Sequence, residues 1–292
     1  MADVKEFPAV WLQGGACSGC AVSILNGASP TVRELLIDQV VPGSHVSLLF
    51  QPTIMAGSGE VALSVLEGPE VSEGFVLIVE GTIPTVEHNE VYCSVGEAGG
   101  VELGLLEKTC EMASRALAVI ALGTCSSFGG IPASANNATG ASSVGDVLAS
   151  RGIDTPLINI PGCPPHPDWF IHTVAGVLLN GLPGADALDD AGRPLEFYGR
   201  TIHEQCPRRP DFDAGKFAHK HGDEGCMYLL GCKGPVTYAD CPVRMWNSGV
   251  SWCVGANAPC IGCVEPSFPD DLGAMYEKID EQGLERLALR TK

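Results

Sequence analysis

The stretch that decides the fold of the last third of the chain is His203-x2-Cys206-x19-Cys226-x5-Cys232-x8-Cys241-x11-Cys253-x6-Cys260-x2-Cys263. Seven cysteines and one histidine are far more than packing requires. Thiolates and imidazoles in sets of four hold either tetrahedral zinc or an iron-sulfur cluster, and eight ligands divide into two such sets. Glycine and proline are frequent between them. The stretch therefore predicts an irregular region held together by metal centres.

The rest of the composition agrees with a metalloprotein of one large domain or two smaller ones. The chain has 292 residues, of which 45% are hydrophobic, so a sizeable core needs no disulfide staples. The thirteen cysteines include two CxxC pairs, and their odd number and irregular spacing favour metal-bound thiolates over disulfides. The cysteines therefore indicate that the chain binds metal.

Charge and hydropathy exclude several classes of partner. With 17 basic and 35 acidic residues the net charge is −18, which argues against nucleic acid and anionic membranes. No apolar run approaches the ~18–20 residues of a membrane span. The first residues show no signal peptide, so we expect a cytoplasmic chain, or a periplasmic one if a leader has been removed.

The first part of the sequence alternates short apolar runs with helical patterns, which predicts a parallel sheet covered on both faces. This α/β order resembles a flavodoxin-like doubly wound fold. A stretch rich in Gly, Pro, Asp and Ala over 181–194 ends it, so we expect a flavodoxin-like domain over 1–182 and a cysteine-rich domain over 183–292. The expected strands are 10–12, 46–50, 75–79, 117–122 and 157–160, and the expected helices are 30–41, 60–66, 101–115, 144–150, 169–179 and the tail 271–292.

Four further cysteines follow predicted strands directly. Cys17 and Cys20 come after the first strand, Cys125 after 117–122, and Cys163 after 157–160. The carboxyl ends of parallel strands share one edge of the sheet, where such folds bind ligands, so these four thiols should converge. A CxxC pair alone is also typical of a thioredoxin-like redox site, but that site needs no third and fourth cysteine.

The remaining two cysteines, Cys93 and Cys110, have no glycine- and proline-rich surroundings and no CxxC partner. We expect them to pack as small hydrophobic residues. Cys110 falls inside a predicted helix. Glu80, at the end of another predicted strand, should reach the same edge as the four thiols. It could relay protons or contact a partner, and a solvated strand-end carboxylate is equally common.

Taken together, these motifs resemble the small, electron-transferring subunit of nickel-iron hydrogenases. The resemblance runs from about Val10 to Pro269, and its motifs occur in the family's order. They are Cys17-x2-Cys20, Gly123-Thr124-Cys125, Pro161-Gly162-Cys163-Pro164-Pro165-His166-Pro167, His203-Glu204-x-Cys206, Gly231-Cys232-Lys233-Gly234-Pro235 and Cys260-Ile261-Gly262-Cys263.

The resemblance implies a heterodimer whose large subunit holds the Ni-Fe centre, while this chain conducts electrons through three [4Fe-4S] clusters to a soluble redox partner. It implies no catalytic residue in this chain. A histidine ligand should raise the potential of the distal cluster relative to four thiolates. The implied ligands are Cys17, Cys20, Cys125 and Cys163 for the proximal cluster, Cys241, Cys253, Cys260 and Cys263 for the medial cluster, and His203, Cys206, Cys226 and Cys232 for the distal cluster.

Two positions separate this chain from parts of the family. Many members have proline where this sequence has Cys253, and their medial cluster has three irons; Cys253 implies a four-iron cluster of lower potential, as in the nickel-iron-selenium members. Oxygen-tolerant members carry extra cysteines where Gly19 and Gly130 stand here, so an ordinary proximal cluster is implied.

Two other functions remain open from the sequence. One is an electron-transfer subunit of another complex, such as a quinone-reducing complex, although those relatives keep only the first cluster. The other is a structural zinc protein without a redox role. Visible absorption that dithionite bleaches distinguishes clusters from zinc.

Overall fold

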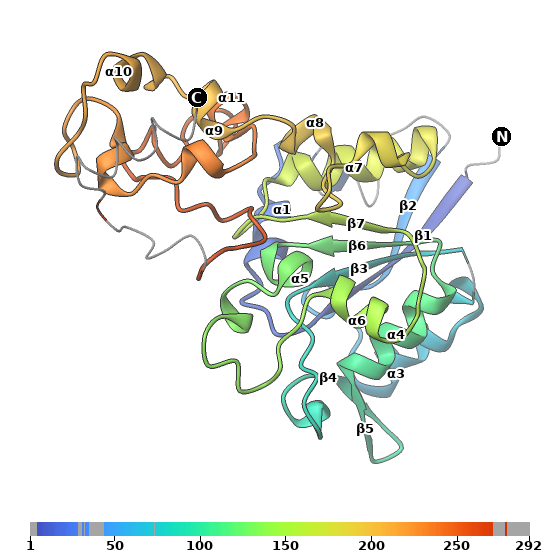
Figure 1. The fold of residues 1–292 in the computed structure, drawn as a ribbon. Coiled ribbons are helices and arrows are strands. Elements are labelled where there is room, and N and C mark those ends of the chain that lie inside the picture. Colours follow the sequence, from blue (N-terminus) through green and yellow to red (C-terminus); the bar gives the residue numbers. More distant parts are fainter. Residues whose placement is uncertain are drawn as a thin grey trace. The chain divides into compact units, whose positions relative to one another are not determined.

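The computed structural model describes residues 5–28, 31, 33–34, 44–72, 74–270 and 278. The chain divides into two compact units, Met1–Pro194 and Leu195–Lys292 (Figure 1). The boundary expected from the sequence came after Leu182 instead. The helices expected over 30–41 and 271–292 fall almost entirely outside the described residues.

A five-stranded parallel sheet forms the centre of the first unit. Its strand order, β2-β1-β3-β6-β7, is that of a flavodoxin-like doubly wound fold and confirms the predicted class. All five residues of β6 are buried, as a strand covered on both faces requires. The strands are β1 (Lys5–Gln13), β2 (Ser44–Phe50), β3 (Val76–Glu80), β6 (Ala118–Leu122) and β7 (Leu157–Ile160).

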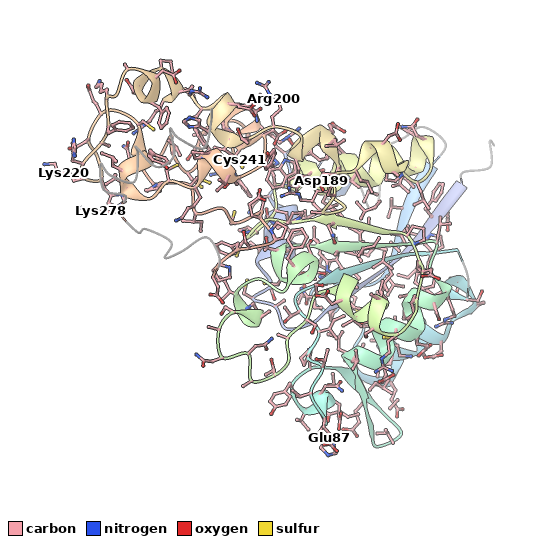
Figure 2. All side chains as sticks on the ribbon, viewed as in Figure 1. Glu87, Asp189, Arg200, Lys220, Cys241 and Lys278 are labelled. Carbon is pink, nitrogen blue, oxygen red and sulfur yellow. The ribbon has the colours of Figure 1, made fainter. Side chains whose placement is uncertain are left out.

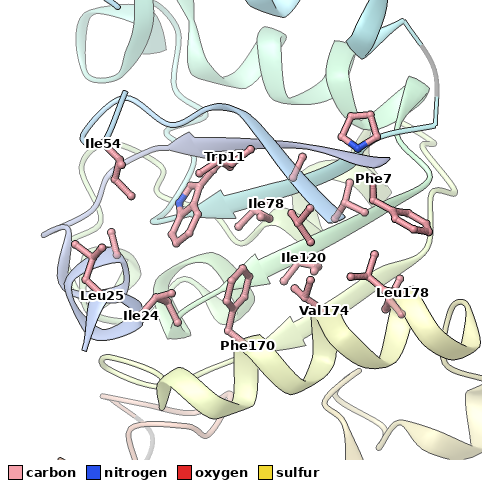
Figure 3. A pocket seen from close by; sticks show the side chains of 17 residues that line it. Phe7, Trp11, Ile24, Leu25, Ile54, Ile78, Ile120, Phe170, Val174 and Leu178 are labelled. Carbon is pink, nitrogen blue, oxygen red and sulfur yellow. The ribbon is translucent and has the colours of Figure 1, made fainter. Parts of the chain in front are cut away.

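Alternating residues of these strands contact helices on opposite faces of the sheet. Leu77 and Val119 belong to the main hydrophobic core, which also includes buried residues of α3, α4 and α6. Ile78 and Ile120 point to the other face, toward α1 and α7 (Figure 3). The helices of this unit are α1 (Gly19–Leu25), α3 (Gly59–Leu63), α4 (Leu105–Arg115), α5 (Thr124–Phe128), α6 (Val144–Ser150) and α7 (Pro167–Asn180), with the 3-10 helices η1 (Ser64–Glu67), η2 (Pro69–Val71), η3 (Asn89–Val91), η4 (Ile131–Ala133) and η5 (Ala185–Ala187).

An apolar cavity lies between this second face and helices α1 and α7 (Figure 3). Trp11 and Ile78 line it from the sheet, Ile24 from α1, and Phe170 and Val174 from α7. Its described lining residues include no cysteine, histidine or charged side chain. The cavity therefore contains none of the predicted cluster ligands.

The helix predicted over 101–115 is wrong in its first turn. Residues 101–104 form strand β5 (Val101–Gly104), which pairs antiparallel with β4 (Ser94–Ala98), and α4 begins only at Leu105. Gly99 and Gly100, with φ of 58° and 79°, supply the positive φ angles of a two-glycine hairpin turn. The apolar residues after this turn therefore pair with a strand.

The second unit consists mainly of loops, as the cysteine-rich sequence predicted. Its helices in the described range have five residues or fewer. Aromatic packing supports them: the Phe212 ring stands edge-on to both Phe217 and Tyr228. These helices are α8 (Leu195–Tyr198), α9 (Ile202–Gln205), α10 (Arg209–Asp213) and α11 (Cys241–Arg244), with the 3-10 helices η6 (Met227–Leu230) and η7 (Gly234–Val236).

Membrane-spanning helices are absent from the described ranges. None of the helices there is both long enough and apolar enough to span a bilayer.

Candidate metal centres

The four strand-end cysteines of the first unit all follow the carboxyl ends of sheet strands. Cys17 lies between β1 and α1, and Cys20 is in the first turn of α1. Cys125 is in α5, directly after β6, and Cys163 follows β7. The turns are tied together by backbone hydrogen bonds, such as Thr124 N–H to the Gly162 carbonyl at 3.0 Å. The sheet thus brings three separate turns to one edge.

Glycines at this edge leave room for the sulfurs. At Gly123, where φ is +91°, an added Cβ would collide with the Cys20 Sγ. A Cβ at Gly19 would lie 3.1 Å from the Cys17 Sγ, and one at Gly130 would lie 3.2 Å from the Cys125 Sγ. Both Gly19 and Gly130 therefore adjoin thiols of this site.

The four thiols also act on one another electrostatically. Burial raises the pKa of Cys20, and Glu80 and the other three cysteines raise it further. Burial, with Cys163 and Cys17, raises the pKa of Cys125 to about 11. Four thiolates this close repel one another, so the ligand form is favoured only when a cationic core lies among them. This donor set fits an iron-sulfur cluster.

Glu80 is not a solvated strand-end carboxylate. It is 1% exposed at the end of β3. One oxygen accepts hydrogen bonds from Trp11 Nε1 at 3.2 Å and Gln13 Nε2 at 2.9 Å, and the other accepts from the Ala21 backbone N–H at 3.2 Å. Ala21 follows Cys20 in α1. Glu80 therefore joins β1, β3 and the cysteine-bearing helix beside the proximal thiols.

In the second unit, one pocket is lined by all four residues expected to bind the distal cluster: His203, Cys206, Cys226 and Cys232. A capping box between Thr201 and Glu204 begins the helix α9, which carries His203. Burial, followed by the nearby Arg209 charge, lowers the pKa of His203, which favours the neutral imidazole that binds metal. This donor set also fits the expected cluster.

The four residues expected to bind the medial cluster are electrostatically linked as well. Cys241 is the first residue of α11 (Figure 2). Burial raises its pKa well above the usual value, and Cys263, Cys260 and Cys253 raise it further, in that order. Cys253 thus acts on the same site as Cys260 and Cys263.

Backbone N–H groups two residues after a cysteine recur as donors to its sulfur. The donors are Gly19 to Cys17, Arg208 to Cys206 and Gly262 to Cys260, each at 3.4 Å. Such hydrogen bonds stabilise thiolate charge and tune cluster potentials. The donor need not be a glycine, because Arg208 makes the same contact as Gly19 and Gly262.

The medial and distal sets are adjacent within the second unit. The Lys233 N–H, next to Cys232, donates to the Cys260 carbonyl at 2.7 Å. Burial raises the pKa of Cys260, and the Cys232 charge raises it further.

Among the described residues, no three His, Cys, Asp or Glu side chains are close enough to share one metal ion. In a four-iron cluster each ligand binds a different iron, so its four ligands lie farther apart than the ligands of a single metal ion.

Comparison with known proteins first defines the class. The family model described as NADH ubiquinone oxidoreductase, 20 Kd subunit, matches residues 17–177, and the C-terminal model of the NiFe/NiFeSe hydrogenase small subunit matches residues 198–276. The first match falls within one compact unit and the second within the other. The chain is therefore an oxidoreductase subunit built from both modules.

Full-length relatives then give the family. The periplasmic [NiFeSe] hydrogenase small subunit of Desulfomicrobium baculatum is 46% identical over 93% of this chain and 87% of its own length. The periplasmic [NiFe] hydrogenase small subunit of Solidesulfovibrio fructosivorans is 39% identical over 92% and 81%. The crystal structure of a reduced, active form of the Ni-Fe-Se hydrogenase from Desulfomicrobium baculatum matches with a TM-score of 0.87, 46% identity, and coverage of 94% of this chain and 100% of that chain.

This chain belongs to the small subunits of the NiFe/NiFeSe hydrogenases. They are the electron-transfer subunits of a heterodimer with a large subunit. The predicted family and class of enzyme are confirmed.

The expected cytoplasmic location is corrected by the same comparison. The two relatives described above are both named as periplasmic proteins. The expectation rested on the lack of a recognisable signal peptide in the first residues, and that feature does not decide the compartment.

Proposed function

We propose that this chain carries three [4Fe-4S] clusters that conduct electrons between the Ni-Fe centre of the large subunit and a soluble redox partner in the periplasm. Oxidation of H2 releases two protons and two electrons at the Ni-Fe centre, and each cluster passes the electrons on singly. The ligands are the proximal, medial and distal sets named above. The proximal set belongs to the flavodoxin-like domain, and the other two sets belong to the cysteine-rich domain.

The observation that carries this proposal is the grouping of the expected ligands. All four expected distal ligands, from segments between residues 203 and 232, line one pocket in the second unit. In the first unit, the charges of the other three strand-end thiols, Cys125, Cys17 and Cys163, all raise the pKa of Cys20. Thiols serving only as packing residues would have no reason to gather in this way. Cys110, by contrast, is buried in the hydrophobic core.

The two other functions considered from the sequence fare differently. The match to the hydrogenase C-terminal model at residues 198–276 places the chain in the hydrogenase family, so membership of another complex is no longer needed as an explanation. A structural zinc role makes a separate prediction, since zinc-loaded protein is colourless and takes up no electrons.

The experiment uses the heterodimer with Cys206→Ala, which removes a distal ligand. We expect H2 oxidation with a soluble acceptor to fall by about tenfold or more. Exchange between D2 and water protons at the Ni-Fe centre should continue, because exchange needs no electron to leave the protein. The two activities are measured on the same preparation.

Cys93→Ala is the matched control, because Cys93 packs partly buried against the core of the first unit. It should leave both activities unchanged. Equal loss of both activities in Cys206→Ala, or no loss of either, would contradict a role of the distal site in electron exit.

A further inference from the structure

Arg208 lies at the distal site by both its backbone and its side chain. It follows Cys206 by two residues and lines the pocket that also contains the four expected ligands. Its backbone N–H donates to the Cys206 Sγ at 3.4 Å. The hydrogen bond to a ligand sulfur and the side chain in the pocket lining both place Arg208 next to the distal ligands.

Two neutral acceptors fix the guanidinium in place. Nη1 donates to the Gly225 carbonyl at 3.0 Å, and Nη2 donates to Asn257 Oδ1 at 2.5 Å. Gly225 precedes the ligand Cys226, so this contact joins the arginine to a second ligand segment. Gly225 has a φ of +107°, a backbone angle that favours glycine. A Cβ added at this position would lie 2.8 Å from the Lys216 carbonyl oxygen.

The neighbouring Arg209 is different. Its Nε donates to Asp213 at 2.8 Å in an ion pair that partly offsets its charge. None of the described contacts of the Arg208 guanidinium is to a carboxylate. Of the two arginines, Arg208 therefore presents the less compensated positive charge to the distal pocket.

We propose that Arg208 raises the reduction potential of the distal cluster. Reduction adds negative charge to the cluster, and a fixed cation and a hydrogen bond to a ligand sulfur both stabilise the reduced form. Arg208 acts through the cluster and its ligands, as a tuning and positioning residue. This inference rests on the proposed [4Fe-4S] cluster at the distal site.

The test is a redox titration of the intact heterodimer, with the distal cluster followed by EPR. Arg208→Gln should lower the midpoint potential of that cluster and leave the proximal one unchanged. Arg208→Lys, which keeps the charge, should retain most of the potential. Arg209→Gln is the matched control and should shift the potential less, because Asp213 partly offsets the charge that this variant removes.

Three results would overturn the inference: an unchanged distal potential in Arg208→Gln, an equal drop in Arg208→Lys, or an equal drop in Arg209→Gln. If Arg208→Gln fails to assemble its cluster, Asn257→Ala takes its place. That variant releases one guanidinium contact and should lower the potential in part; no shift would count against the inference. Absence of any distal signal in the unmodified protein would instead refute the proposed function.

Discussion

At the scale of single residues, we expect Cys253 to decide whether the proposed medial cluster has three irons or four. It shares the electrostatic surroundings of Cys241 with Cys260 and Cys263, and its carbonyl accepts hydrogen bonds from the backbone N–H groups of Ala256 and Ala258. Proline at this position keeps that carbonyl and removes the thiol. We expect Cys253→Pro to convert the medial centre to a three-iron cluster of higher potential, detected by EPR of the oxidised heterodimer. An unchanged signal would show that Cys253 is not a ligand.

Glu80 supports a second prediction at this scale. Its buried carboxylate contributes, after burial itself, to the high pKa of Cys20, so it disfavours negative charge at the proximal site. Glu80→Gln keeps the shape and removes the charge. The potential of the proximal cluster should rise, because reduction then adds an electron to a less negative environment. A titration that finds the proximal potential lower or unchanged would contradict this electrostatic role.

At the scale of elements, the turn between β6 and α5 places Cys125 and makes room for Cys20. An alanine at Gly123 has a positive φ of 91° and a Cβ that collides with the Cys20 Sγ. Strain of this kind costs about 1–3 kcal/mol, and the collision displaces a ligand sulfur. We expect Gly123→Ala to lose the proximal cluster, measured as lost iron and a lost proximal EPR signal.

The control for this prediction is Gly152→Ala. Gly152 also has a positive φ, of 64°, but an added Cβ meets no atom within 4 Å. This variant should lower stability by about 1 kcal/mol and keep all its iron. Equal iron loss in both variants would mean that backbone strain, and not the contact with Cys20, disturbs the site.

The sequence predicted the regular elements well where local and tertiary signals agree. The expected strand 157–160 and helix 144–150 have the bounds of β7 and α6. An apolar run marks the strand, and the Ser143 side chain caps the helix. Helix α1 was not predicted, since its seven residues carry little periodicity. The hairpin at 94–104 was missed because its apolar residues also fit the helical pattern that follows.

Spacing and strand ends singled out the candidate ligands, and the family resemblance assigned them to three clusters, but neither could predict their surroundings. That Glu80 is buried among Trp11, Gln13 and Ala21 depends on the approach of three elements. The charge of Arg208 matters only because the fold holds it against Gly225 and Asn257. Such effects arise from contacts between segments distant in sequence.

At the scale of the whole molecule, the two compact units account for the two family models that match the chain. The first unit has a regular sheet that brings thiols together at strand ends. The second has short helices and loops, and we expect much of its stability to depend on its clusters. Chelation of iron should therefore unfold the second unit before the first, which hydrogen exchange can follow. Simultaneous loss of protection in both units would contradict this dependence.

The central claim is that this chain holds three clusters of four irons each. The most direct measurement is iron, acid-labile sulfide and zinc content of the heterodimer, combined with Mössbauer spectra of the reduced and oxidised protein. The account predicts about twelve cluster irons and about twelve sulfides per small subunit, in three distinguishable cubanes, with no stoichiometric zinc. Zinc in place of iron, or a cluster content that lacks one of the three cubanes, would contradict it.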